Sequence, residues 1–362
     1  MGANWLVEAS LRYRFAAAGL VSLSAVLGTS SPGWASPGQF IQFEGICNAS
    51  AGVALTDDLF VVADDEDKVF NKRLEIKPLP FRLYSLTRPG PPIQVGELPG
   101  LDLKPEIKEE VSGELDLEAS APLEDVVFWI GSHSTGDKAA KAPNRRRLFA
   151  VRFRLKDGQL NVDRVGHVYQ SLLKDLAKDH RYAQFNLKEA AKLDSKVPGG
   201  LSIEGMTALP GEALLGRTLA IGLRNPVPNG KALVITMLNP MQVIAGGDAR
   251  FGDPIQLDLG GQGIRSMDTI GNSVLIVGGP AKAPENSDKG SHRLYRWSGK
   301  GTDQPLPMNQ PNIKGLFVEA VFPVGKTLMF VSDDGKLKLP KGLCQDLDKK
   351  QQGFRAFAVP LP

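Results

Sequence analysis

Residues 203–206 read Ile-Glu-Gly-Met, and two apolar runs follow them, TLAIGLRNP (218–226) and KALVITML (231–238). The same order of a short motif, a β-branched run and a third run recurs along the chain. Repetition of this kind is typical of propellers, solenoids and arrays. Period-2 alternation between bounding turn residues predicts that each run is a strand and not a helix.

The short motif occurs five times, each at the start of a predicted first strand. The copies are FEGI (43–46), LEAS (117–120), IEGM (203–206), IRSM (264–267) and VEAV (318–321). The second strands are LFVVADDED (59–67), VVFWIGSHS (126–134), TLAIGLRNP (218–226), SVLIVGGP (273–280) and TLMFVSDDG (327–335). The third strands are FRLYSL (81–86), RRLFAVRFRL (146–155), KALVITML (231–238), HRLYRW (292–297) and FRAFAVPL (354–361). These units predict an all-β fold, a single β-propeller of about five blades. A pair of β-sandwiches or a mixed two-domain fold is the alternative.

Two further segments complete this architecture. The last predicted blade lacks a fourth strand, and residues 39–43 (QFIQF) can supply it from the other end of the chain. Such closure removes an exposed sheet edge. Residues near 169–194 carry Leu172, Leu173 and Leu176 at helical spacing, which predicts a helical insertion between the second and third blades. We interpret the insertion as a packing element or a lid.

The first 35 residues have the features of a signal peptide. Arg12 and Arg14 precede the apolar run 15–28, and Gly33-Trp34-Ala35 suits a cleavage site after Ala35. An uncleaved membrane anchor is the alternative. No later stretch of 18 apolar residues follows, so we expect no membrane span after signal removal. The predicted division is therefore a signal peptide, 1–35, and an exported propeller domain, 36–362, in the periplasm or outside the cell.

Export changes the interpretation of the two cysteines, Cys47 and Cys344. An even number of cysteines in an oxidising compartment predicts a disulfide, with two free buried thiols as the alternative. The net charge of +3 is too small to indicate binding to nucleic acid or to an anionic membrane surface. We expect a monomer whose partner is a small molecule or a metal ion.

The recurring polar residues are predicted to meet on one face of the propeller. Consecutive strands of a blade run antiparallel, so the start of the first strand, the end of the second and the start of the third share one end. The residues predicted on this ligand-binding face are Glu44, Asp64, Asp65, Glu118, His133, Arg145, Arg146, Glu204, Arg224, Asn225, Arg265, Glu319, Asp333 and Asp334. Ser132, Lys231, His292, Arg293, Glu66 and Asp67 also belong to it.

The innermost positions are predicted to form a charged ring, because first strands line the central channel. The ring consists of Glu44, Glu118, Glu204, Arg265 and Glu319. Its four carboxylates repel one another unless a cation, neighbouring arginines or protons neutralise them. Clusters of oxygen ligands suit Ca²⁺ or Mg²⁺, so the four glutamates are candidate ligands of Ca²⁺. Alternatively, each glutamate accepts backbone N–H bonds from the next blade.

The basic residues of the same face form a second predicted group, made of Arg145, Arg146, Arg224, Arg265 and His133. Arginine presents a fork of donors that matches phosphate or carboxylate, so this group is a candidate anion clamp. Ion pairing with the acidic ring is the alternative. His133, Arg145, Arg224 and Arg265 are the candidate catalytic residues. No Gly-x-Ser-x-Gly elbow accompanies His133, which argues against a serine hydrolase.

Several longer motifs carry a resemblance to a known family. FEGICNAS, FVVADDED, WIGSHS, PNRRRLFA, LSIEGM, GLRNP, LGGQGIRSM and RLYRWSG together resemble a family of exported bacterial proteins of unknown function. The Glu-Gly strand start is more distantly similar to esterase-like phytase and SdiA-regulated propellers. That similarity implies a propeller and permits a Ca²⁺-dependent phosphoesterase, although Arg265 and Ala119 depart from the Glu-Gly pattern. A shared fold does not transfer a function.

Three functions follow from these features. The first is a propeller that binds a small anionic or metal-bridged ligand on the Glu/Arg face. The second is a Ca²⁺-dependent phosphoesterase, in which a metal would polarise a phosphoryl oxygen and activate water. The third is a scaffold that docks other proteins. The identity of the ligand does not follow from the residues.

Overall fold

The computed structural model describes residues 40–65, 68–69, 80–93, 113–136, 141–156, 159–211, 218–281, 291–309 and 311–362. All the described residues belong to one compact unit. The predicted signal peptide, Glu66 and Asp67 lie outside the described residues.

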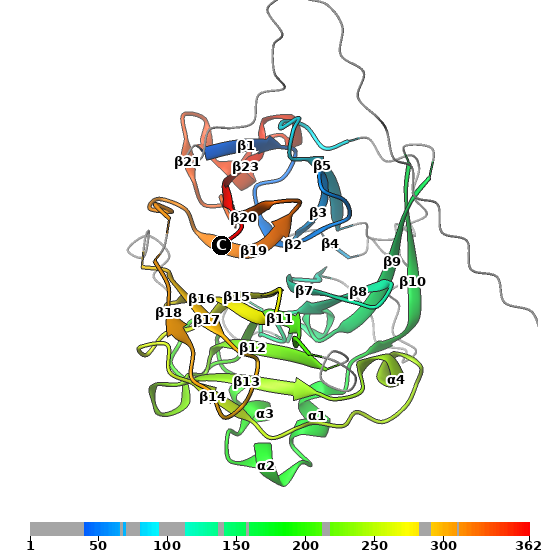
Figure 1. Cartoon of the computed structure of the whole chain (residues 1–362), viewed down its shortest axis with the longest axis vertical. Coiled ribbons are helices and arrows are strands. Elements are labelled where there is room, and N and C mark those ends of the chain that lie inside the picture. Colours follow the sequence, from blue (N-terminus) through cyan, green and yellow to red (C-terminus); the bar gives the residue numbers. More distant parts are fainter. Residues whose placement is uncertain are drawn as a thin grey trace, which may run out of the picture. The chain divides into compact units, whose positions relative to one another are not determined.

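Five antiparallel sheets form the five blades, which we number in chain order; most of their strands are labelled in Figure 1. Blade one contains β2 (Ala49–Ala54), β3 (Leu59–Asp64) and β5 (Phe81–Ser85). Blade two contains β7 (Leu117–Leu123), β8 (Val126–Gly131), β9 (Leu148–Lys156) and β10 (Gln159–Tyr169). Blade three contains β11 (Ser202–Ala208), β12 (Leu219–Asn225), β13 (Ala232–Met237) and β14 (Ile255–Leu257).

The last two blades have the same plan. Blade four contains β15 (Gly263–Ile270), β16 (Ser273–Gly279), β17 (Arg293–Trp297) and β18 (Leu306–Pro307). Blade five contains β19 (Val318–Val324), β20 (Thr327–Ser332), β23 (Gly353–Pro360) and β1 (Phe40–Glu44). Two short pairs lie outside the blades, β4 (Lys68–Val69) with β6 (Gly113–Glu114) and β21 (Lys338–Leu339) with β22 (Gly342–Leu343).

The blades close into a ring around their innermost strands. These strands, β2, β7, β11, β15 and β19, each contact the next, and β19 contacts β2. Five separate hydrophobic clusters fill the spaces between successive blades. Second strands such as β8 are buried along their whole length, because both sheet faces are covered by neighbouring blades. The predicted five-bladed propeller is therefore confirmed.

The ring is closed by a strand from the other end of the chain, as predicted. β1 pairs antiparallel with β23, with Phe43 opposite Phe354, and forms the outermost strand of blade five. The two rings stack with centroids 5.2 Å apart, and both side chains are fully buried. The closure thus combines a hydrogen-bonded ladder with an aromatic core.

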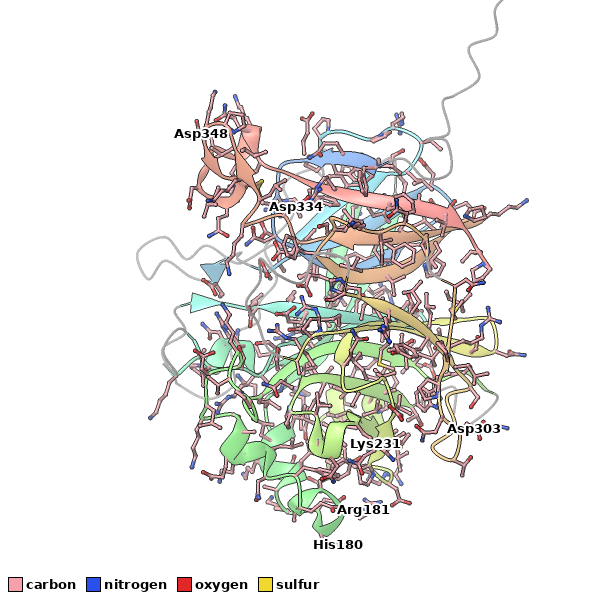
Figure 2. All side chains as sticks on the ribbon, turned by 90° about the vertical axis from the view of Figure 1, so that its left-hand side faces the viewer. His180, Arg181, Lys231, Asp303, Asp334 and Asp348 are labelled. Carbon is pink, nitrogen blue, oxygen red and sulfur yellow. A yellow bond between two sulfur atoms is a disulfide. The ribbon has the colours of Figure 1, made fainter. Side chains whose placement is uncertain are left out.

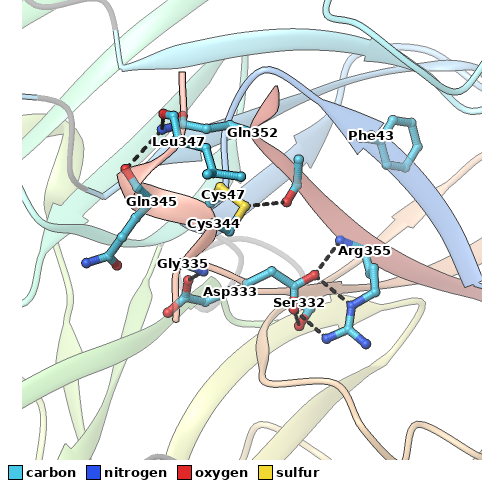
Figure 3. The surroundings of a disulfide bond; sticks show 12 residues. Phe43, Cys47, Ser332, Asp333, Gly335, Cys344, Gln345, Leu347, Gln352 and Arg355 are labelled. Carbon is cyan, nitrogen blue, oxygen red and sulfur yellow. Dashed lines mark hydrogen bonds and ion pairs between the residues drawn. A yellow bond between two sulfur atoms is a disulfide. The ribbon is translucent and has the colours of Figure 1, made fainter. Parts of the chain in front are cut away.

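A disulfide between Cys47 and Cys344 supports the same closure (Figure 3), and the prediction of this bond is confirmed. It joins the segment between β1 and β2 to the segment between β20 and β23. The backbone beside it is also bonded, since the Asp334 N–H donates to the Cys47 carbonyl at 2.9 Å. The first and last parts of the domain are therefore held together next to the central axis.

The predicted helical insertion contains three short helices, α1 (Leu172–Leu176), α2 (His180–Ala183) and α3 (Leu187–Ala190). Leu172, Leu176 and Leu187 pack into the hydrophobic cluster between blades two and three, so the insertion is a packing element. Figure 2 shows His180 and Arg181 at the tip of this insertion. A further helix, α4 (Pro240–Ile244), follows β13 and was not predicted.

Short 3₁₀ helices span Pro143–Arg145, Pro228–Gly230, Cys344–Asp346 and Lys349–Gln351. None of the helices in the described parts of the chain combines the length and apolar character needed to cross a membrane.

Candidate functional site

A β-bulge occurs at the same place in all five innermost strands. In β7, for example, Leu117 pairs with Gly131 and Ala119 with Ile130, so Glu118 has no partner in the ladder. Bulges re-aim the side chain of the extra residue. The equivalent residues in the chain order of the blades are Ser50, Glu118, Glu204, Arg265 and Glu319. Their side chains form the inner ring.

The prediction that Glu44 belongs to this ring is wrong. Glu44 ends β1, pairs with Gly353 at the outer edge of blade five, and is exposed. The motif 43–46 resembles a first strand in composition, but its strand closes the ring from outside. In blade one the ring position falls to Ser50, whose hydroxyl donates to the Leu117 carbonyl. The ring therefore contains three glutamates, one arginine and one serine.

Arg265 neutralises two of the three ring glutamates. Its guanidinium lies 3.0 Å from Glu204 Oε2 and also contacts Glu319, so it links blades three, four and five. Arg224 pairs with the other oxygen of Glu204 at 2.6 Å, and Ser202 donates to the same oxygen at 3.0 Å. Glu204 is 2% exposed. Glu204, Glu319, Arg224 and Arg265 therefore form a structural network of ion pairs. This is the alternative given above for the basic residues, in which they pair with the acidic ring.

The third ring glutamate, Glu118, faces other carboxylates. Oxygen atoms of Asp65, Asp116 and Glu118 all lie within 4.8 Å of one another. Asp65 directly follows β3, and Asp116 directly precedes β7, so the ends of two blades bring the three groups together. One oxygen of Asp65 is buried without a hydrogen-bond partner among the described residues.

The electrostatics of these acidic groups favour a bound cation. Burial raises the pKa values of Asp65 and Glu118 well above their usual ranges, and neighbouring carboxylates raise them further. Burial also raises the pKa of Asp116, although Arg145 beside it opposes the shift. Asp333 faces the same group, and burial raises its pKa to about 6. Several carboxylates thus lie close together in the wall of one partly buried site, where their charges repel one another.

Asp116 is fixed in place by two neighbours. Arg145 lies 3.1 Å from its carboxylate and 2.7 Å from Glu114, and the Ser132 hydroxyl also donates to Asp116. Sequence reasoning missed Asp116 and Glu114. Their signal is the alternation Glu114-Leu115-Asp116-Leu117, which places the carboxylates on one side of an extended segment.

A polar cavity of about 540 Å³ opens over these groups. Its wall includes Asp65, Asp116, Glu118, Glu204, Glu319 and Asp333, together with Arg145 and Arg224. A separate small cavity of about 10 Å³ shares Glu118 with this one and is also bordered by Ser50 and Asp268. The larger cavity therefore gathers residues from all blades except the fourth, whose Arg265 lies behind Glu204 and Glu319.

Several predicted site residues do not line the cavity. Asn225 holds a loop by donating to the carbonyls of Ser195 and Val197. Asp334 is buried and accepts three hydrogen bonds from Arg355. These two residues support the scaffold.

Three more predicted site residues, His133, Arg146 and Asp64, also do not line the cavity. His133 is fully buried, donates Nδ1–H to the Gly131 carbonyl, and has its pKa lowered by burial to about 4. Arg146 donates to the Ala191 carbonyl, and Asp64 is buried beside β5. The predicted clamp of Arg145, Arg146, Arg224, Arg265 and His133 is therefore not a set of free donors, because three of its arginines are paired with carboxylates.

Fold and site define the class: a five-bladed propeller with an acidic cavity at one end of its axis. Residues 154–327 match the model of a family described as "Protein of unknown function (DUF3616)". The predicted resemblance to a family of unknown function is thus confirmed. No curated protein matches the chain.

Solved structures with similar folds share little sequence with this chain. The β-propeller domain of Cps50 (Swd1) from Myceliophteria thermophila is 8% identical, with a TM-score of 0.33, over 88% of this chain and 98% of that one. A protein of unknown function from Dyadobacter fermentans is 10% identical, with a TM-score of 0.36, over 85% and 74%. A glucose dehydrogenase is 11% identical, with a TM-score of 0.40, over 90% and 100%.

Proposed function

We propose that this propeller binds a hard divalent cation, with Ca²⁺ as the preferred ion, at Asp65, Asp116 and Glu118. The observation that carries the proposal is the approach of three carboxylate oxygens to within 4.8 Å of one another. Ca²⁺ holds its oxygen ligands at about 2.3–2.6 Å, so oxygens on opposite sides of the ion are about 5 Å apart. One ion can therefore contact all three groups.

The chemistry of the cavity wall supports the same ion class. The wall residues in the described part of the chain offer carboxylate, hydroxyl and amide oxygens, and neither cysteine nor histidine is among them. Such ligands suit Ca²⁺ or Mg²⁺ better than zinc or copper. Bound cation also relieves the repulsion that otherwise keeps protons on Asp65 and Glu118.

We propose further that the ion holds a small anionic ligand in the cavity. Three protein carboxylates leave coordination positions open on a cation that takes about six to eight oxygens. A space of about 540 Å³ accommodates a small organic molecule. A Ca²⁺-dependent phosphoesterase would need the same ion, and of the candidate catalytic residues Arg145 and Arg224 line the cavity. A protein-docking scaffold would not need it.

Calorimetric titration with CaCl₂ and MgCl₂, and melting curves with and without chelator, test the cation site. We expect Ca²⁺ to bind and to raise the melting temperature of the wild type. Glu118→Gln and Asp65→Asn should lose binding, whereas Glu44→Gln, an exposed carboxylate outside the ring, should keep it. Equal Ca²⁺ affinity in Glu118→Gln and the wild type would refute the site.

A panel of phosphoesters separates binder from enzyme. Turnover above background in Ca²⁺-loaded wild type, and its loss in Glu118→Gln, would favour the phosphoesterase. Background rates in both proteins would leave the binding function.

We also propose that the protein is exported to the periplasm or the cell exterior, on a separate observation. The Cys47–Cys344 disulfide supports export, because disulfides persist in oxidising compartments. Sequencing the N-terminus of protein recovered from the cell envelope or medium would test cleavage after Ala35.

A further inference from the structure

Three consecutive arginines, Arg145 to Arg147, precede β9, and they differ in what they contact. Arg145 pairs with Glu114 and Asp116, and Arg146 donates to a main-chain carbonyl. Arg147 is 1% exposed and has no carboxylate partner among the residues that the structure describes. Arg147 lies opposite Gly131, whose N–H donates to the Arg147 carbonyl. Because successive side chains of an extended segment point to opposite sides, the Arg147 side chain points away from that of Arg146.

The one side-chain partner of Arg147 among those residues is Asn144. Arg147 Nη2 donates to Asn144 Oδ1 at 3.0 Å, while its Nε and Nη1 have no hydrogen-bond partner. This contact fixes the orientation of the Asn144 amide, because the oxygen must face the guanidinium. The amide nitrogen of Asn144 is buried and likewise has no hydrogen-bond partner in the described part of the chain.

The side-chain atoms of Asn144 and Arg147 that have no hydrogen-bond partner among the described residues are all donors, and Arg147 carries a full positive charge. Burial without a counter-ion lowers the pKa of Arg147 to about 10, which leaves it charged at neutral pH. A buried unpaired donor costs free energy, so its persistence calls for an acceptor. Asn144 is 2% exposed and borders the 540 Å³ cavity, together with Ala142 and Lys141 of the same segment.

From this geometry we infer that Asn144 and Arg147 form an oxyanion subsite in the wall of the cavity. Asn144 donates its amide N–H to a phosphate or carboxylate oxygen of the ligand. Arg147 is a positioning residue that orients this amide and places positive charge behind it. The subsite receives the anionic group of the ligand that the cation holds. It rests on the proposed function only for that cation.

Inorganic phosphate and acetate are the probes, titrated into full-length protein with saturating Ca²⁺ and again without it. We expect phosphate to bind, more tightly with Ca²⁺. Asn144→Asp keeps an oxygen for Arg147 but replaces the donor with a negative charge. It should therefore melt no lower than the wild type and lose about tenfold or more in phosphate affinity. Acetate binding in place of phosphate would identify a carboxylate ligand.

A second variant separates binding from folding. Arg147→Met replaces an unpaired buried charge with an apolar side chain of similar length, so stability should hold or rise while phosphate affinity falls. A structural role would instead lower stability. Arg152→Met is the matched control in β9, where the arginine pairs with Asp125 away from the cavity. It should leave phosphate affinity unchanged.

The outcomes distinguish the two proposals. Wild-type phosphate affinity in Asn144→Asp, or no binding of either probe to Ca²⁺-loaded protein, would overturn the subsite even if Ca²⁺ binds. If Ca²⁺ does not bind, the cation site fails. In that case, phosphate binding that is lost in Asn144→Asp would still support the subsite.

Discussion

Arg265 is expected to be the most sensitive residue of the inner ring, and Arg265→Met tests this. The guanidinium contacts Glu204 of blade three and Glu319 of blade five from β15 of blade four. All three side chains are at least about seven-eighths buried, with exposed fractions of 12%, 2% and 12%. Methionine keeps the apolar length of the side chain but leaves Glu319 without its counter-ion.

The expected loss is about 3–5 kcal/mol in the free energy of unfolding, the usual effect of removing one partner of a buried ion pair. Arg224 still neutralises Glu204, so most of the loss comes from Glu319. An uncompensated buried carboxylate has a raised folded-state pKa, and its penalty is present above that pKa and fades as protonation occurs. The difference from wild type should therefore be larger at pH 8 than at pH 5.

Urea unfolding followed by tryptophan fluorescence at both pH values measures this difference. The double variant Arg265→Met/Glu319→Gln should recover much of the loss, because it also removes the carboxylate that loses its counter-ion and leaves Glu204 paired with Arg224. Arg296→Met, an exposed arginine in β17 of the same blade, is the control. A change below about 0.5 kcal/mol at pH 8, or a larger loss at pH 5, would refute the electrostatic argument.

Three further predictions concern the closure and the axis. Replacing Cys47 and Cys344 by alanine opens a crosslink spanning 297 residues, which should cost about 6 kcal/mol on the chain-entropy model; an unchanged urea midpoint would contradict this. Phe43→Ala should cost about 3–5 kcal/mol because it empties the core of the closing strand, whereas Phe40→Ala, 48% exposed, should cost far less in the same assay. Asp268 has its pKa raised by burial to about 7, so the folded state holds its proton more tightly than the unfolded state. Stability should fall by at most about 4 kcal/mol as pH rises from 4 to 7, and pH-dependent unfolding of Asp268→Asn should lack this fall.

The repeated apolar runs were sufficient to predict the blades and the closing strand. A strand covered on both faces must be apolar along its length, as 126–131 is, and that requirement is visible in residue order alone. Residues 39–43 were identifiable as the missing fourth strand because the last repeat ends one strand short, and the observed strand spans Phe40–Glu44. The bond between Cys47 and Cys344 follows from an even cysteine count and predicted export.

The charged ring was only partly predictable. Glu118, Glu204, Arg265 and Glu319 share a bulge in their strands, but the motif around Glu44 has the same composition without the bulge. Strand composition does not reveal whether a segment lies at the axis or at the rim. Ser50 therefore escaped notice, although it occupies the axial position of blade one.

By itself, the sequence determined which segments are strands, how many blades they form and which face carries the charged residues, because burial and alternation are local properties. Only the tertiary structure decided the partners of those charges. Arg265 meets Glu204 and Glu319 because three blades converge at the axis. Asp65 meets Asp116 and Glu118 because the end of the second strand of blade one lies beside the start of the innermost strand of blade two. Ion pairing depends on distances between atoms far apart in the chain, which residue order does not encode locally.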